Sequence, residues 1–379
     1  MKSREPVLVH GRDTWDKVNL PESLFDDRIA AIRAILEEQS LDVILVYGRG
    51  DSDGHLSYVS NLVNKVPNWG LLVAITPDGI RIRNERSSRT QPVIERGTWI
   101  RDFEFVSSVV TDIHDFIGIT EGGRIGTVGL ETLPHAQYQA FLDQVERDTI
   151  VQLDEAFWDF REAKHPKERD QIARAGRIML DVHDFIQETE LAPTTERHVT
   201  NQADRIARLR GIRDVRTLIG NHAQTEPHLR PAEEIPIEEG SPVSLYTAGR
   251  FEGYWAEYAR TYRFGKDEIE VILPSKLENV YQEAIDSIVV GMSAEDVQAS
   301  FETTLSAAGF DLSPAYSVGH GIGLDIAEPP TLTEGNSHTI SDGMTLSVRA
   351  VVDSADHGLI VMNDTICVTA NGVQLVTRT

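Results

Sequence analysis

Cysteine is almost absent from the 379-residue sequence, in which Cys367 is the only example. A single thiol can form neither an intramolecular disulfide nor a cysteine-based zinc cluster. Cys367 lies in the apolar run Thr365-Ile366-Cys367-Val368, so we expect a buried structural thiol and give it no catalytic role. The cysteine usage is consistent with a reducing compartment, and we expect a cytoplasmic protein.

Long hydrophobic runs are also lacking. No segment approaches the roughly 20 apolar residues of a membrane span, and the charges of residues 1–6 are not followed by an apolar stretch. Basic residues are scarce beside acidic ones, since 36 Lys and Arg face 60 Asp and Glu for a formal charge of −24. Such a charge repels phosphate backbones and anionic lipid, so we expect neither nucleic acid nor membrane as a partner.

The length predicts two domains, each of ordinary size. Apolar residues recur at helical spacing over 24–38, and buried strands are expected at 41–47, 70–76 and 124–130, with a helix from Pro134 onward. This pattern predicts an N-terminal α/β domain over residues 1–158. A charged stretch with Pro166 then separates it from a second domain over residues 159–379.

The second domain alternates predicted helices with strand-like segments. Helical patterns cover 168–188, 274–290 and 294–308, and Ser293 with Asp296 resembles a helix N-cap. Strand-like runs surround five positions along the chain: Val243, Tyr262, Leu346, Leu359 and Cys367. The fold class expected for the whole chain is therefore mixed α/β (α+β).

Four local motifs follow one another along the second domain. They are Thr225-Glu226-Pro227-His228-Leu229-Arg230-Pro231, Gly253-Tyr254-Trp255-Ala256-Glu257-Tyr258-Ala259-Arg260-Thr261, Gly319-His320-Gly321-Ile322-Gly323-Leu324 with Glu328-Pro329-Pro330, and Asn363-Asp364-Thr365-Ile366-Cys367-Val368-Thr369. In order and spacing they resemble the motifs of the pita-bread superfamily, which contains methionine aminopeptidase, aminopeptidase P, prolidase and creatinase. The resemblance implies a creatinase-like α/β domain followed by a pita-bread catalytic domain.

The resemblance does not extend to the metal ligands. In the metallopeptidases of this superfamily two Asp, one His and two Glu hold a pair of divalent ions. Here the matching positions are Tyr246, Glu257, His320, Arg349 and Asn363. Paired hard cations need several anionic oxygen donors, and a guanidinium places a fixed positive charge where a cation would bind. We therefore expect no metal and no cofactor, and a single ion held by Glu257, His320 and waters stays open as the less favoured alternative.

Creatinase, a member of the superfamily that this chain resembles, hydrolyses a small molecule without metal and uses the His of its Pro-His motif to move protons. His228 is the matching position, and an imidazole can both accept and return a proton near neutral pH. We predict His228, Glu257 and His320 as catalytic residues.

Arg349 is suited to holding a carboxylate through paired hydrogen bonds, although a structural ion pair with Glu257 is an equal alternative. Tyr246 and Asn363 can donate hydrogen bonds to a substrate. In dimeric relatives the N-terminal domain reaches the partner's pocket, so Lys65 is a further predicted substrate contact, and we expect a homodimer.

The leading hypothesis is a metal-independent hydrolase that cleaves a C–N bond in a small polar substrate carrying a carboxylate. Two alternatives stay open. One is a catalytically silent binding protein with a peptidase-like fold, and the other is a lyase, decarboxylase or isomerase on the same fold. If peptidase activity had simply been lost, random apolar residues should stand at the former ligand positions. Tyr246, Arg349 and Asn363 are all polar, which favours an enzyme over a silent binding protein.

Overall fold

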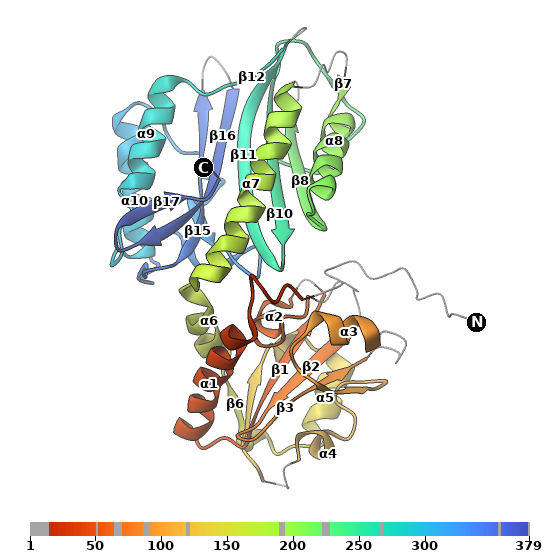
Figure 1. The fold of residues 1–379 in the computed structure, drawn as a ribbon. Coiled ribbons are helices and arrows are strands. Elements are labelled where there is room, and N and C mark those ends of the chain that lie inside the picture. Colours follow the sequence, from red (N-terminus) through yellow and green to blue (C-terminus); the bar gives the residue numbers. More distant parts are fainter. Residues whose placement is uncertain are drawn as a thin grey trace, which may run out of the picture. The chain divides into compact units, whose positions relative to one another are not determined.

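The computed structural model describes residues 15–50, 52–63, 70–85, 91–118, 122–188, 194–221, 228–265, 268–354 and 358–377 (Figure 1). The chain forms two compact units, Met1–Arg161 and Glu162–Thr379. Residue 158, the end of the N-terminal domain in the sequence analysis, lies inside a helix, α6 (Asp154–Glu162). In the described ranges no helix is long and apolar enough to cross a membrane.

The N-terminal unit is a six-stranded mixed sheet with helices. Its strands run in the order β4-β3-β2-β1-β5-β6, and β1 pairs antiparallel with β2 but parallel with β5. The strand bounds are β1 Val43–Arg49, β2 Gly70–Ile75, β3 Ile80–Asn84, β4 Asp102–Phe105, β5 Ile125–Val128 and β6 Ile150–Gln152. The helices are α1 Glu22–Glu38, α2 Gly54–Ser60, α3 Gln91–Gly97, α4 Ile113–Ile117, α5 His135–Leu142 and α6. The expected strand over 124–130 forms only at β5, because Gly129 turns the chain with a positive φ.

The C-terminal unit is built on a nine-stranded sheet. Seven strands follow the order β14-β13-β15-β16-β11-β10-β8, while β12 pairs with β11 and β17 with β16. The bounds are β8 Asp214–Asn221, β10 Pro242–Phe251, β11 Tyr254–Phe264, β12 Ile269–Val271, β13 Gly319–Gly321, β14 Glu328–Leu332, β15 Thr345–Ser354, β16 Gly358–Thr369 and β17 Gly372–Leu375. A separate short pair joins β7 (Thr194–Thr195) to β9 (Pro236–Ile237). All the expected strand positions of this domain lie in these strands.

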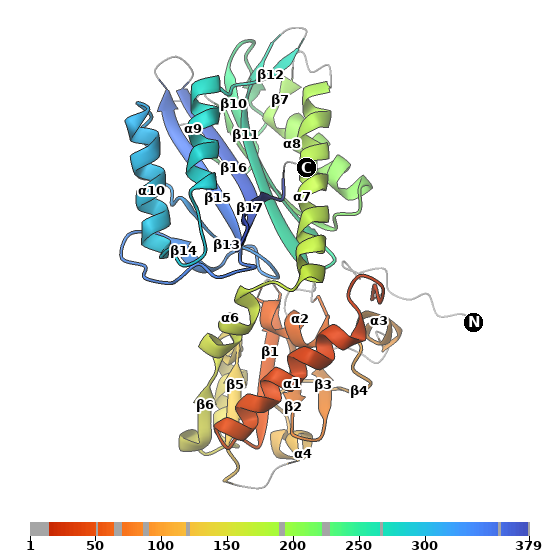
Figure 2. The ribbon, with the colours of Figure 1, turned by 60° about the vertical axis from the view of Figure 1, so that its left-hand side comes forward.

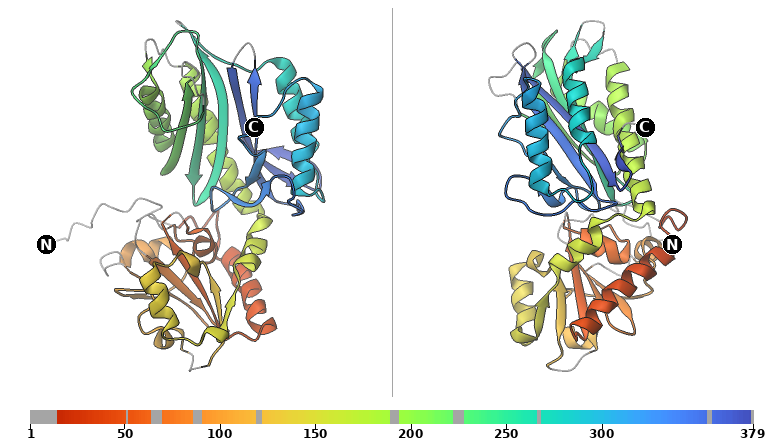
Figure 3. Two further views of the ribbon diagram at one scale, coloured as in Figure 1. Left: turned by 180° about the vertical axis from the view of Figure 1, so that it is seen from behind. Right: turned by 90° about the vertical axis from the view of Figure 1, so that its left-hand side faces the viewer.

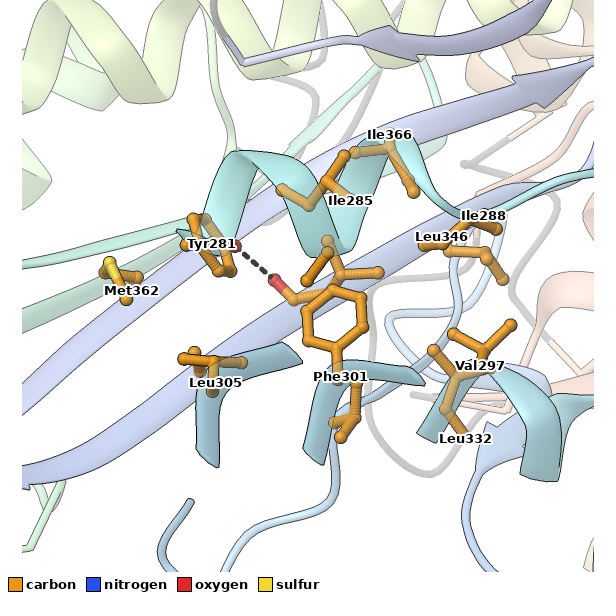
Figure 4. Packing of buried hydrophobic residues seen from close by; sticks show 14 of the residues in the cluster. Tyr281, Ile285, Ile288, Val297, Phe301, Leu305, Leu332, Leu346, Met362 and Ile366 are labelled. Atoms are coloured by element: carbon orange, nitrogen blue, oxygen red, sulfur yellow. Dashed lines mark hydrogen bonds between the residues drawn. The ribbon is translucent and has the colours of Figure 1, made fainter. Parts of the chain in front are cut away.

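The helices described in this unit are α7 (Pro166–Glu188), α8 (Glu196–Leu209), α9 (Ser275–Asp286) and α10 (Ala294–Ala307). Helix α10 begins with the expected cap, where Ser293 and Asp296 bond each other's backbone N–H groups. Figure 2 shows α7, α9 and α10 on one side of the sheet. The main core lies beneath α9 and α10, where Tyr281 and Phe301 are fully buried and the Tyr281 hydroxyl donates to the Val348 carbonyl at 3.1 Å (Figure 4).

Strand alternation divides the side chains of this sheet between two faces. The pairs Arg349↔Asn363 and Ala259↔Asn363 place one set of alternate residues of β15, β16 and β11 on the same face. The other set, which includes Leu346, Val348 and Met362, packs into the core under the helices. Figure 3 (left) shows the sheet from behind, with its strands in front of α7. The face away from the helices is therefore the one that can hold a site.

A buried polar network joins α7 to the helix-covered face. His183 of α7 contacts the Tyr262 hydroxyl through Nδ1 at 2.5 Å and the Thr247 hydroxyl through Nε2 at 3.0 Å. Arg260 donates two hydrogen bonds to Asp364, at 2.8 and 3.0 Å, and both residues are buried. Burial, with the nearby Arg260 charge, lowers the pKa of His183 from 6.5 to about 3. The imidazole is thus neutral in the folded protein at physiological pH.

This pKa predicts a specific dependence of stability on pH. Between about pH 3 and pH 6.5 the unfolded chain binds a proton at His183 that the folded chain does not, so acidification favours unfolding. His183→Gln keeps hydrogen-bonding atoms but cannot titrate. We expect the stability advantage of the wild type over His183→Gln to shrink by about 2 kcal/mol from pH 7 to pH 5. Urea unfolding of both proteins at each pH measures this difference, and parallel pH curves for the two would contradict it.

Candidate functional site

A polar cluster occupies the face of the C-terminal sheet away from the helices. Five of the predicted residues come together there because strand alternation and the register direct their side chains to the same face of the sheet. They are Tyr246 on β10, Glu257 on β11, His320 on β13, Arg349 on β15 and Asn363 on β16. Apolar residues of the same face flank them, with Ala248, Trp255 and Ile322 on one side and Ala259, Val351 and Val361 on the other.

Glu257 is the centre of the hydrogen bonding in this cluster. Its side chain is almost completely buried, and the Ser347 hydroxyl donates to Oε2 at 2.5 Å. The Tyr246 hydroxyl donates a second hydrogen bond to the same carboxylate. The Glu257 backbone is held as well, since Thr365 Oγ1 accepts from its N–H at 2.9 Å and donates to its carbonyl at 3.0 Å. A buried carboxylate bound in this way is a positioned anion.

His320 lies beside this carboxylate, with its Nε2 3.8 Å from Glu257 Oε1. Its Nδ1 is 2.9 Å from the carbonyl oxygen of Gly321. A carbonyl can only accept, so Nδ1 carries the hydrogen and Nε2 is the nitrogen that can gain or lose a proton. The 3.8 Å separation is longer than a hydrogen bond, and the two groups interact electrostatically.

Tyr246 remains a hydrogen-bond donor over the whole physiological range. Burial and the neighbouring Glu257 carboxylate raise the pKa of Tyr246 well above its usual value, while Arg349 and Arg216 act in the opposite direction. These influences also place both arginines in the electrostatic surroundings of the Tyr246 hydroxyl. The cluster thus combines one carboxylate, a phenol and two cations.

The Asn363 amide is held by two acceptors on the neighbouring strand. Its Nδ2 donates to Ser347 Oγ at 2.8 Å and to the Val348 carbonyl at 3.2 Å. Its Oδ1 is buried and has no hydrogen-bond partner within the part of the chain that the structure describes.

Arg349 does not form the structural ion pair with Glu257 that the sequence left as an equal alternative. Glu257 accepts hydrogen bonds from Ser347 and Tyr246 and lies near His320, and among the described residues no ion pair includes Arg349. Its Nε is buried, and no hydrogen-bond partner for it lies within the described ranges.

The other two predicted residues lie apart from the buried cluster or outside the described ranges. His228 is exposed and precedes Arg230, which bridges to Ile219 of β8. Leu229, next to it, packs with Tyr246 against Ala259 and Val361, so this segment borders the cluster. Lys65 falls outside the described residues.

Sequence reasoning missed Ser347, Thr365 and Arg216. Ser347 and Thr365 bind Glu257 directly, and Arg216 lies over the Trp255 ring at 5.5 Å. None of these three residues stands at one of the five positions that match metal ligands in the metallopeptidases. Alternation was the available signal for the first two, because Ser347 is two residues before Arg349 and Thr365 is two residues after Asn363.

Comparison with known proteins identifies the family. The model of metallopeptidase family M24 matches residues 170–370, which is more than half of the 379-residue chain and includes the whole cluster. The chain belongs to family M24. The resemblance drawn from the four motifs is therefore confirmed.

Individual relatives in the M24 family carry peptidase names. An uncharacterized peptidase of Staphylococcus haemolyticus is 25% identical over 233 residues, which are 60% of this chain and 65% of the relative. The chain thus spans slightly less than two thirds of that protein. A Xaa-Pro dipeptidase of Pyrococcus furiosus is 22% identical over 278 residues, 71% of this chain and 77% of the relative.

The fold is that of solved prolidases. The crystal structure of the prolidase from Pyrococcus horikoshii superposes with a TM-score of 0.76 and 19% identity, covering 93% of this chain and 98% of that one. The predicted fold, an N-terminal α/β domain followed by a pita-bread domain, is confirmed.

The donor atoms of the cluster do not fit the pair of divalent ions that the family name implies. Three of the five matching positions carry a phenol, a guanidinium and a carboxamide in place of carboxylates. Within the described ranges, no group of three or more His, Cys, Asp and Glu side chains could hold a metal ion. Glu257 and His320 alone give fewer protein ligands than catalytic metal sites have.

The bond between Ser347 and Glu257 predicts a stability effect. Ser347→Ala removes a donor from a buried carboxylate and an acceptor from Asn363, so we expect a loss of about 1–3 kcal/mol. Ser306→Ala is a matched control, because the exposed Ser306 hydroxyl donates to Asp311 at 3.0 Å. Its loss should stay within about 0.5 kcal/mol. Equal effects of the two substitutions in urea unfolding would contradict the assigned role of Ser347.

Proposed function

We propose that this M24 chain is a metal-independent hydrolase that cleaves a C–N bond in a small polar substrate carrying a carboxylate. The observation that carries the proposal is Arg349, whose Nε has no hydrogen-bond partner among the described residues and which stands at a position where the metallopeptidases of the resemblance have a ligand carboxylate. The relatives are named peptidases and dipeptidases, whose reaction is C–N hydrolysis. A dipeptide or acylated amino acid offers both the bond and the anion.

The chemistry follows from the neighbouring groups. Water must add to the carbonyl carbon, the C–N bond must break, and the leaving nitrogen must take up a proton. In this proposal Glu257 and His320 Nε2 orient the water, and His228, on the bordering segment, takes a proton from it and returns that proton to the leaving nitrogen. The Tyr246 hydroxyl, whose one hydrogen is donated to Glu257 in the free protein, turns to donate it to the developing oxyanion.

The donor set supports independence from metal, and elemental analysis tests it. Purified protein should contain no stoichiometric transition metal, and a chelator should leave hydrolysis of a panel of dipeptides and N-acyl amino acids unchanged. About two ions per chain, with activity that chelation abolishes and manganese or cobalt restores, would overturn this part of the proposal.

Kinetics of two variants separate chemistry from recognition. His228→Ala should lower kcat by about 10²- to 10⁴-fold with little change in KM, because general acid–base catalysis contributes about that much. Arg349→Ala should mainly raise KM, since an anion contact made equally in ground and transition states contributes uniform binding.

A thermal melt of each variant checks that it is folded. Normal turnover by folded His228→Ala would contradict the proposal that His228 transfers the proton as in creatinase. Absence of turnover by the wild type over the whole panel, together with retained ligand binding, would favour the silent binding protein.

A further inference from the structure

The turn between β16 and β17 carries an Asn-Gly pair. Asn371 is the one Asn of the sequence that is followed by Gly. The two strands meet at the pair Thr369↔Gly372, so Asn371 lies at the tip of a tight hairpin. Asn371 is exposed, and Gly372 takes a φ of +107°, which favours Gly over other residues. Such residues are typical of turns that connect antiparallel strands.

The hydrogen bonds of this turn hold its backbone and leave the Asn371 side chain out. Thr369 Oγ1 accepts from the Asn371 backbone N–H at 3.3 Å and donates to the Gly372 carbonyl at 2.8 Å. Within the described ranges no hydrogen bond includes the side-chain amide of Asn371. A Cβ added at Gly372 would meet no heavy atom within 4 Å, so the space beside this residue is open. The Asn371 amide can therefore approach the backbone nitrogen of the next residue.

Asn336, which is followed by the small residue Ser337, is the comparison within the same chain. Its Nδ2 donates to the Thr331 carbonyl at 2.7 Å, and its Oδ1 accepts from the His338 N–H at 3.1 Å. Both ends of this amide are bound, and both bonds must break before the group can turn toward its own backbone. The fold thus protects the Asn336 amide in a way that it does not protect Asn371.

An Asn amide beside an unhindered backbone nitrogen can rearrange covalently. We propose that Asn371 is a site of spontaneous deamidation, with water as the co-reactant. The Gly372 nitrogen bonds to the side-chain carbonyl carbon of Asn371, the bond from that carbon to Nδ2 breaks, and ammonia leaves with the proton that Gly372 gives up. Water then opens the cyclic imide, adding its hydroxyl to a carbonyl carbon and its remaining hydrogen to the nitrogen. Addition at the side-chain carbon gives aspartate, and addition at the main-chain carbon gives isoaspartate.

The isoaspartyl product changes the backbone of the turn as well as its charge. Its main chain runs through the former side chain and contains an extra methylene between β16 and β17. Because the turn sets the register of a hairpin, this product should weaken the pairing of β17. Strand β17 leads to Thr377, whose hydroxyl donates to the buried Asp364 at 2.9 Å. The modification is therefore expected to lower the stability of the C-terminal unit.

Peptide mapping of aged protein tests the site. Full-length wild type is incubated in warm, mildly alkaline buffer made with heavy-oxygen water, then digested in ordinary water and analysed by mass spectrometry. We expect the peptide with Asn371 to gain a heavy oxygen and to separate into aspartyl and isoaspartyl isomers. The peptide with Asn336 should react at least about tenfold more slowly, because two hydrogen bonds must break first. Asn371→Gln, whose longer side chain disfavours ring closure, is the control and should give no product at this position.

Absence of conversion at Asn371 in the folded protein, or conversion of Asn336 at an equal rate, would overturn the proposal. Urea unfolding then measures the effect on the turn. The purified isoaspartyl form should unfold at a lower urea concentration than Asn371→Asp, which carries the same charge on an ordinary backbone. Equal unfolding midpoints for these two proteins would contradict the weakened pairing of β17.

Discussion

The register of β11, β16 and β15 is the constraint on which the C-terminal unit depends. Ala259 faces Asn363, and Asn363 faces Arg349, so one parity of all three strands is directed away from the helices. If β15 slipped by one residue, Arg349 would point into the core with Leu346, and Val348 would point to the site. Because unpaired charge in a core costs far more than exposed apolar surface, the register is strongly determined.

Buried polar pairs on the opposite face reinforce that register. Arg260 and Asp364 come from β11 and β16, and Arg260 also donates to the Asn363 carbonyl at 3.0 Å. His183 connects α7 to Tyr262 on β11 and to Thr247 on β10. Breaking such a pair leaves a charge without its partner, which is the source of its cost. The same strands that hold these pairs carry the site residues on their other side.

The site keeps the family's framework and changes its electrostatics. In the metallopeptidases of the resemblance, four carboxylates and one imidazole surround two cations. Here one carboxylate, Glu257, remains in the cluster, and Arg349 replaces another with a positive charge. The charge of the cluster therefore differs from that of the metallopeptidase pattern, although the strands that present the residues belong to the same fold.

The sequence by itself determined the fold and most of the site residues. Hydrophobic periodicity predicted α1, α7 and α10, and Ser293 with Asp296 marked the start of α10, because these are local signals that depend on neighbouring residues. The four ordered motifs identified the superfamily and the positions of Tyr246, Glu257, His320, Arg349 and Asn363. Only the tertiary structure decided what these side chains contact. Ser347 reaches Glu257 across 90 residues of sequence, and Arg349 Nε has no hydrogen-bond partner in the described part of the chain. Both facts depend on strand pairing between distant segments. No local pattern records which atoms of two residues on different strands remain unpaired.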